Sequence, residues 1–296
     1  MSIASLLLPD FALILLGFIL FRVTNWGQEF WNGAEKLVYY VLFPALLFYS
    51  TTRTPLDLSS TGKLLQTAMI ALVGGIALGW LGKPLLRPGP MLFESGVQTA
   101  FRFNSYMALA LASRLAGDQG VGLMALIIGF AVPTANMAAV HALTHKDGGL
   151  LREMAKNPML VSTLCGLLFN LAGLHVPEML GASLSRLGNA SIALGLIMVG
   201  AGLRMSALNE AKALAVWFTT IKLLAMPALA FAVGRWLELP RLQFQIAIMF
   251  AALPTASSAY VLAARMGGNG PYVAFLISAG TILSIVTLPM WLALAG

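Results

Sequence analysis

The chain has 296 residues, of which 59% are hydrophobic and 10% are charged, and its net charge is +7. A soluble domain carries about 25% charged residues, and a globule of this length cannot bury so much apolar surface, so these values exclude a soluble fold. The Lys and Arg residues stand singly between apolar runs, as they do in loops beside a lipid bilayer, so no nucleic-acid partner is expected.

Ten apolar runs follow one another along the chain, and each has about the 20 residues that a helix needs to cross the hydrocarbon core. No Lys or Arg precedes the first run, and Pro9 and Asp10 interrupt it, which indicates a retained helix rather than a cleaved signal peptide. The sequence therefore predicts an all-α integral membrane protein. The predicted transmembrane helices cover residues 5–22, 34–52, 63–83, 93–116, 119–144, 157–175, 183–204, 210–236, 241–266 and 271–294.

Basic residues in the loops predict the orientation of these helices. Loops after odd-numbered helices hold ten Lys and Arg residues, and loops after even-numbered helices hold six. Because basic residues concentrate on the cytoplasmic side of a membrane, the odd-numbered loops are expected in the cytoplasm. Both termini are then expected outside.

An internal repeat relates the two halves of the chain, because a shift of 151 residues aligns them without a gap. The halves are residues 1–145 and 157–296, joined by a short cytoplasmic loop at 146–156. Five helices is an odd number, so the second half enters the membrane inverted, as is typical of secondary transporters. An old duplication kept for stability alone is the alternative. The coincident positions include Arg53 and Arg204, Phe93 and Phe244, and residues 112–118 and 263–269.

Two predicted helices that are equivalent under the repeat, the fourth and the ninth, have polar interruptions near their middles. One interruption is Arg102-Phe103-Asn104-Ser105-Tyr106 and the other is Leu253-Pro254-Thr255-Ala256-Ser257-Ser258. Broken helices direct N-terminal amides, with their partial positive charge, at one point between the halves. The alternative is a pair of kinked helices patched by polar side chains. The anion-binding site predicted from this pattern consists of Arg102, Asn104, Ser105, Tyr106, Pro254, Thr255, Ala256 and Ser257.

Arg102 and Lys222 are the two basic residues well inside predicted helices. Each costs roughly 2.5–3.5 kcal/mol at a helix centre, so each is expected to face a cavity or a partner. Arg102 either contacts the anion or caps carbonyl groups of its own broken helix, and the sequence leaves both roles open. For Lys222, an ion pair or a side chain that extends to the bilayer surface is favoured over substrate contact. Asn136 is likewise assigned a charge or structural role.

Several other patterns favour structural roles over chemistry. Cys165 is the single cysteine, which excludes an intrachain disulfide and a Cys-based metal site. His141 and His145 are expected to be exposed helix-end residues, and Gly75 and Gly79 indicate close helix packing. Neither a nucleophile–His–acid set nor a phosphate-binding glycine loop is present, so no enzyme activity, cofactor or metal is expected. Packing kinks are expected at Pro44, Pro133, Pro227 and Pro289.

Together these segments resemble the auxin efflux carrier family, which includes the plant PIN-formed auxin exporters and bacterial permeases. The resemblance runs through most of the chain. Its strongest part is Arg102-Phe103-Asn104-Ser105-Tyr106, which is similar to the family's Arg-x-Asn crossover segment. The other matching segments are Lys156-Asn157-Pro158, Gly195-Leu196-Ile197-Met198-Val199-Gly200-Ala201-Gly202, Leu253-Pro254-Thr255-Ala256, and Thr281-Ile282-Leu283-Ser284 with Pro289.

The resemblance implies a fold like that of bile acid/sodium symporters, with outside termini and crossed, broken fourth and ninth helices. It also implies a scaffold of helices 1, 2, 6 and 7, forming a homodimer, and an elevator-like transport part of helices 3–5 and 8–10. A bacterial member would lie in the inner membrane with periplasmic termini. Substrates in the family are carboxylates such as auxins and dicarboxylic acids. This chain lacks an acidic residue in the middle of helix three, so no proton-linked role is implied there.

The sequence therefore predicts a carrier for a small organic anion. The alternative is a ligand-sensing membrane protein that uses the fold without transport. A sensor usually carries a soluble output domain, whereas the longest polar stretch here is only 145–157. No cluster of carboxylates inside the membrane marks a sodium or proton site, which favours a uniporter driven by the substrate gradient and the membrane potential. The identity of the substrate and the direction of transport stay open.

Overall fold

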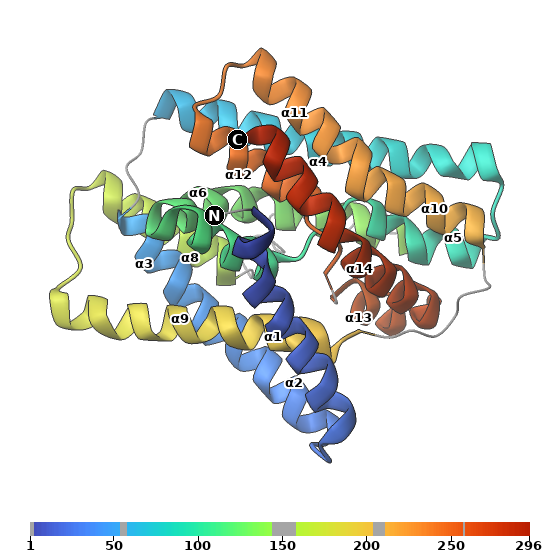
Figure 1. Cartoon of the computed structure of the whole chain (residues 1–296), viewed down its shortest axis with the longest axis horizontal. Helices are drawn as coiled ribbons and strands as arrows, with labels where there is room; N and C mark the ends of the chain where they lie inside the picture. The colour runs from blue at the N-terminus through green and yellow to red at the C-terminus, as the bar shows by residue number, and fades with distance from the viewer. Residues whose placement is uncertain (1–2, 54–57, 144–157, 204–210, 257) are drawn as a thin grey trace. The chain divides into compact units, whose positions relative to one another are not determined.

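The computed structural model describes residues 3–53, 58–143, 158–203, 211–256 and 258–296. Helices are the regular elements throughout these ranges, and no strand occurs among them (Figure 1). The chain divides into two compact units. The first unit comprises Met1–Thr61, Ser105–Phe130 and Leu151–Gly202, and the second comprises Gly62–Asn104, Ala131–Leu150 and Leu203–Gly296.

The helices of the structure follow the predicted runs closely. In chain order they are α1 (Ile3–Val23), α2 (Gln28–Leu37), the π-helical turn η1 (Val38–Leu42), α3 (Phe43–Arg53), α4 (Leu58–Leu86), α5 (Pro90–Gly96), the 3₁₀ turn η2 (Val97–Ala100), α6 (Ser105–Leu143), α8 (Pro158–Leu171), α9 (Glu178–Ala201), α10 (Lys212–Thr220), the π-helical turn η3 (Ile221–Ala225), α11 (Met226–Trp236), α12 (Arg241–Ala252), α13 (Ser258–Arg265) and α14 (Gly270–Ala295).

Five stretches of the described chain are long and apolar enough to cross a membrane, as an integral membrane protein requires. One of them, Pro90–Leu143, contains the predicted run 93–116 and all but the last residue of the run 119–144. The backbone of α6 leaves the helical conformation between those runs, at Ala116 and at Gly117, where φ is +53°. That all ten runs cross the bilayer stays a prediction. The five stretches are Thr61–Leu86, Pro90–Leu143, Glu178–Ala201, Lys212–Trp236 and Gly270–Ala295.

In the first unit α9 packs against both α1 and α3, and α3 also packs against α8 (Figure 1). Glycine allows α1 and α9 to approach backbone to backbone. A Cβ atom on Gly200 would overlap the carbonyl oxygen of Ile14, and one on Gly17 would overlap that of Ile197. Small residues are the usual means by which membrane helices approach closely, because lipid supplies no hydrophobic force between them.

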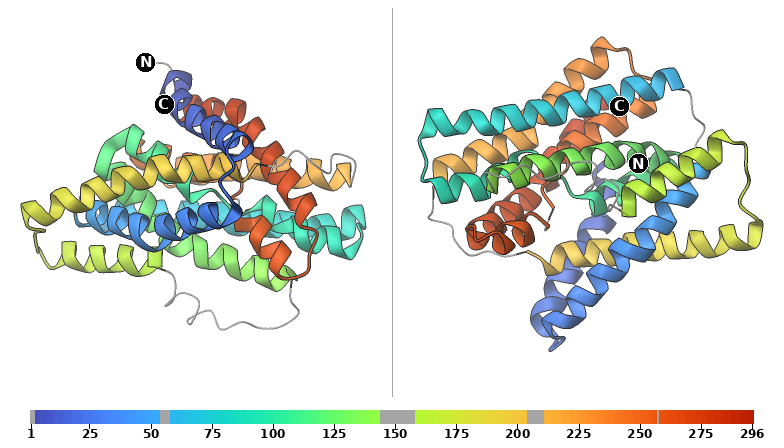
Figure 2. Two further views of the ribbon diagram at one scale, coloured as in Figure 1. Left: turned by 90° about the horizontal axis from the view of Figure 1, so that it is seen from below. Right: turned by 180° about the vertical axis from the view of Figure 1, so that it is seen from behind.

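In the second unit α4 lies alongside the run from α10 to α11, as both views in Figure 2 show. A Cβ atom on Gly75 would come within 2.6 Å of the Met226 sulfur, and one on Gly79 within 3.3 Å of Val97 and Ala100. The close packing predicted at Gly75 and Gly79 is therefore confirmed.

Two of the prolines predicted to kink helices each lie two residues after the end of a π-helical turn. Pro44 comes after η1, and Pro227 comes after η3. A proline lacks the N–H group that would bond to the carbonyl four residues earlier. For Pro227 that carbonyl belongs to Leu223, and the indole N–H of Trp291 donates to it at 2.9 Å. The side chain of a neighbouring helix thus replaces the missing backbone bond, as burial in lipid requires.

The contact between α1 and α9 predicts a large difference between two Gly→Ala substitutions. Gly200→Ala forces the two backbones apart, and overpacking of this kind typically costs about 1–3 kcal/mol. Gly280→Ala is the matched control, since an added Cβ on α14 meets no described heavy atom within 4 Å and alanine favours a helix by about 1 kcal/mol. Thermal unfolding of the purified protein in detergent should show a lower midpoint for Gly200→Ala alone. Equal midpoints would contradict the close contact.

Candidate functional site

The two breaks predicted in the sequence are both present. The turn η2 ends at Ala100 and α6 begins at Ser105, so residues 101–104 form a first non-helical crossover. The helix α12 ends at Ala252 and α13 begins at Ser258, and residues 253–256 are the described part of a second crossover. Both crossovers lie in the second unit.

Hydrogen bonds join the two crossovers directly. The backbone N–H of Asn104 donates to the carbonyl oxygen of Pro254 at 2.9 Å. The hydroxyl of Thr255 donates to the carbonyl oxygen of Thr99, the residue just before the end of η2, at 2.7 Å. Asn104, Pro254 and Thr255 are all buried. The structure therefore brings these three predicted site residues together.

Arg102 is the charged group at this junction, and its side chain is held from three elements. One guanidinium nitrogen donates to Gln98 Oε1 at 3.1 Å. The other donates to Asn136 Oδ1 on α6 at 2.9 Å and to the Ser258 hydroxyl, at the start of α13, at 3.1 Å. Arg102 is only 9% exposed. Asn136, assigned a charge or structural role from the sequence, thus contributes by orienting Arg102.

Lys222 lies on η3 and is 2% exposed. Its ammonium group donates to the carbonyl oxygen of Ala251, next to the last residue of α12, at 2.9 Å, and lies 3.6 Å from the Met226 sulfur. The expectation of a side chain that extends to the bilayer surface is therefore wrong. The sequence also allowed an ion pair for Lys222. Within the described residues, its ammonium group instead bonds to a carbonyl at the negative end of a helix dipole.

The remaining predicted site residues are Ser105, Tyr106, Ala256 and Ser257. Ser105 and Tyr106 begin α6 and belong to the first unit. The Tyr106 ring stacks on Phe43 with centroids 4.8 Å apart, so it has a packing partner within its own unit. Ala256 is half-buried, and Ser257 lies outside the described residues.

Sequence reasoning missed Gln98, Thr99 and Ser258 as members of this site. A signal existed for Gln98, because it is four residues before Arg102 and so one helical turn away. For Thr99 the contribution is a backbone carbonyl, which its side chain does not reveal. Ser258 stood in the polar interruption of the ninth helix, but its partner on the fourth helix depends on how the two helices cross.

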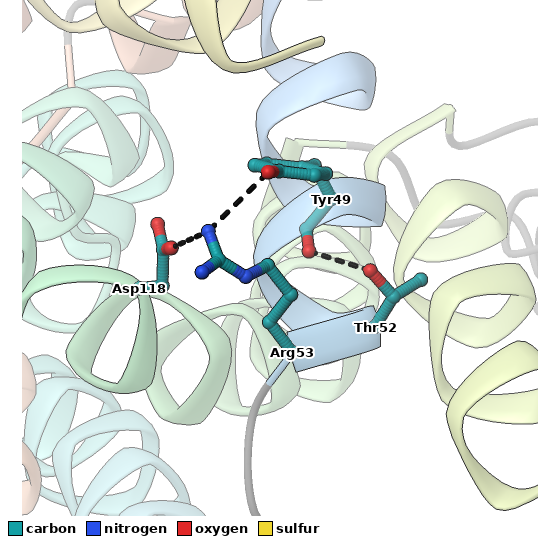
Figure 3. Close-up of polar contacts among 4 residues, drawn as sticks. All are labelled: Tyr49, Thr52, Arg53 and Asp118. Atoms are coloured by element: carbon teal, nitrogen blue, oxygen red, sulfur yellow. Dashed lines mark hydrogen bonds and ion pairs between the residues drawn. The ribbon is translucent and has the colours of Figure 1, made fainter. Parts of the chain in front are cut away.

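A second polar cluster in the first unit is exposed (Figure 3). Arg53, at the end of α3, donates to the Asp118 carboxylate at 2.6 Å and to the Tyr49 hydroxyl at 3.3 Å. The Arg53 and Asp118 side chains are 55% and 45% exposed, and an exposed ion pair contributes about 0–1 kcal/mol. The cluster joins two helix ends and holds no buried charge.

The described residues contain no group of three His, Cys, Asp or Glu side chains that could hold a metal ion. His141 lies beside Trp80, with ring centroids 5.8 Å apart. His145 lies outside the described residues. The guanidinium of Arg102 donates to side-chain oxygen atoms, and the ammonium group of Lys222 donates to a backbone carbonyl oxygen.

Comparisons with known proteins show similarity to membrane transporters. The model of a family described as "Membrane transport protein" matches residues 148–292. An "Uncharacterized transporter" of Methanothermobacter thermautotrophicus is 27% identical over 300 residues, which cover 98% of each chain. A "Putative malonate transporter" of Rhizobium meliloti is 26% identical over 97% of this chain and 93% of its own.

A third relative, the "Uncharacterized transporter YfdV" of Escherichia coli, is 23% identical over 97% of this chain and 95% of its own. The similarity therefore extends along nearly the whole sequence and is not confined to the half that the family model matches. The family match and the names of these relatives indicate that this multi-pass chain is a membrane transporter and not an enzyme.

Proposed function

We propose that the protein is a secondary carrier for a small organic anion, which binds where the two crossovers meet. The observation that carries the proposal is the buried Arg102 guanidinium, held by Gln98, Asn136 and Ser258 beside the hydrogen-bonded crossovers. The sequence left two roles open for Arg102, which were anion binding and capping of carbonyl groups. The proposal assigns it the first.

The chemistry of Arg102 suits a carboxylate ligand. A guanidinium stays protonated in proteins, and the bonds to Gln98, Asn136 and Ser258 fix its orientation. Its planar fork matches the two oxygens of a carboxylate. The helix α13 begins at Ser258, an Arg102 partner, and the partial positive charge of a helix N-terminus adds to the attraction.

Small dicarboxylates are the substrate class that we propose to test first. One relative of similar length carries the name "Putative malonate transporter", and the family resemblance points to carboxylates. Malonate carries two carboxylates, the group whose two oxygens the Arg102 guanidinium matches.

The ten-helix inverted topology is part of the proposal, and helix-end contacts support it. Asn170 donates to the Thr51 carbonyl at 2.8 Å, and Asn269 donates its backbone N–H to the Ser95 hydroxyl at 2.8 Å. Each of these contacts, like that between Arg53 and Asp118, joins two helix ends that ten crossings would put on the same side of the membrane. A chain with one crossing fewer between such partners would separate them by the thickness of the bilayer.

An elevator mechanism is the mode of transport that we propose. The first unit contains predicted helices 1, 2, 6 and 7, the proposed scaffold, and the second contains helices 3, 8, 9 and 10. This grouping supports the division except at Ser105–Phe130, which clusters with the first unit. The homodimer and the location in a bacterial inner membrane rest on the family resemblance.

Arg102→Ala should weaken malonate binding about ten- to a hundredfold, because a hydrogen bond to a charged group contributes about 1.5–3 kcal/mol. Asn136→Ala should weaken it less, since Asn136 only orients the guanidinium. Equilibrium binding of labelled malonate to purified protein would measure both. Arg53→Ala is the matched control, an exposed arginine that should leave affinity unchanged. A folded Arg102→Ala protein with normal affinity would overturn the site.

Transport of the anion alone should be electrogenic. Each charge that crosses is driven by about 2.3 kcal/mol per 100 mV, so a lumen made positive should accelerate malonate entry into proteoliposomes. The measurement is initial uptake at potentials set with potassium and valinomycin. Uptake that ignores the potential but requires a sodium or proton gradient would contradict uniport.

The orientation can be tested with single cysteines in a background that lacks the exposed Cys165. We expect Gly296→Cys to react with an impermeant maleimide in intact cells, because an outside terminus is accessible. Asp147→Cys, in the predicted cytoplasmic loop, should react only after the membrane is permeabilised. The reverse pattern would show that the orientation is inverted.

A further inference from the structure

The carbonyl groups at the C-terminal end of α12 need hydrogen-bond donors, and they lie in apolar surroundings. The last four carbonyl groups of a helix have no partner within it, and they form the negative end of its dipole. Every residue from Ile246 to Leu253 is fully buried. Within such surroundings carbonyl groups need a donor from another segment, since neither water nor lipid headgroups reach them.

Lys222 supplies one of these donors. Its ammonium group donates to the Ala251 carbonyl at 2.9 Å, and the residues around it on η3 and α11, such as Leu223 and Met226, are buried as well. A neutral donor such as Trp291, which satisfies Leu223 nearby, would satisfy a carbonyl at far lower cost of desolvation. The use of a lysine, whose charged form is costly to bury, therefore suggests a role beyond a single hydrogen bond.

Transporters with broken helices commonly bind their coupling cation with carbonyl groups at the C-terminal ends of half-helices. We propose that the Lys222 ammonium is a covalently attached cation at such a place, so the protein needs no bound inorganic cation at the end of α12. Lys222 then acts as a positioning residue. It fixes Ala251, three residues before Pro254, whose carbonyl accepts from Asn104 in the other crossover.

The proposal makes a distinctive prediction for the truncated side chain. Lys222→Ala removes three carbons and the ammonium group, which together have the shape of propylammonium. Lys222→Met fills nearly the same space without a charge, so it controls for volume. If the place requires a cation, added propylammonium should restore Lys222→Ala and leave both Lys222→Met and the unmodified protein unchanged.

The first measurement is thermal unfolding in detergent, with propylammonium chloride compared with choline chloride, whose cation is too large to enter. A ligand that binds only the folded state raises the midpoint by mass action, so we expect Lys222→Ala to gain at least about 2 °C. Equal midpoints in the two salts, or an equal gain for Lys222→Met, would overturn the proposal. If Lys222→Ala is recovered as a folded monodisperse protein only when propylammonium is present during extraction, that too supports it. Failure to recover folded Lys222→Ala protein, with or without propylammonium, would overturn the proposal.

The second measurement, which rests on the proposed function, is malonate uptake into proteoliposomes. The unmodified protein should transport equally well in sodium, potassium and choline salts. Lys222→Ala should lose about ten- to a hundredfold in choline and recover in propylammonium. Sodium-stimulated uptake by the unmodified protein would overturn the proposal. Absence of malonate uptake by the unmodified protein would instead contradict the substrate class, and the unfolding measurement would still decide the role of Lys222.

Discussion

The requirement that every buried backbone group find a partner governs the centre of this protein. Two helices stop in the apolar interior, and each leaves carbonyl and amide groups that neither lipid nor water can satisfy. The crossovers meet this requirement largely by bonding to each other, through Asn104 with Pro254 and Thr255 with Thr99. One crossover alone would be unstable in a bilayer. Each break is tolerable because the other lies beside it, and the place where they meet is the place where polar chemistry is possible.

The two buried basic groups lie at different helix ends and bond to different kinds of group. Arg102 lies near the start of α13 and bonds to side chains, whereas Lys222 lies at the end of α12 and bonds to a backbone carbonyl. A cation at the end of a helix is favoured by the dipole, and a cation near the start of a helix is opposed by it. Lys222 is therefore electrostatically suited to remain where it is. The negative ligand that we propose would be favoured at the start of α13, beside Arg102.

Much of this arrangement could be predicted from the sequence. Long runs of apolar residues predict membrane helices, and polar clusters within such runs predict breaks. Pro254 and the segment from Arg102 to Tyr106 therefore located both crossovers correctly. The partners could not be predicted in the same way. The bonds from Arg102 to Asn136 and Ser258 depend on how separate helices pack, which the sequence does not mark. Lys222 was misjudged because the acceptor that it needed is a backbone carbonyl, which every residue possesses and no side chain marks.

The carbonyl of Leu223 is bonded by the indole of Trp291, and Leu223 follows Lys222 directly in the same π-helical turn. Indole fluorescence depends on hydrogen bonding and local polarity. Trp291 is therefore an intrinsic fluorophore bonded to the residue that follows Lys222. Trp217 bonds in the same fashion to Leu78 on α4, farther along the same helical run. The chain has six Trp residues, so a variant that keeps Trp291 alone would report optically on this turn without any added label.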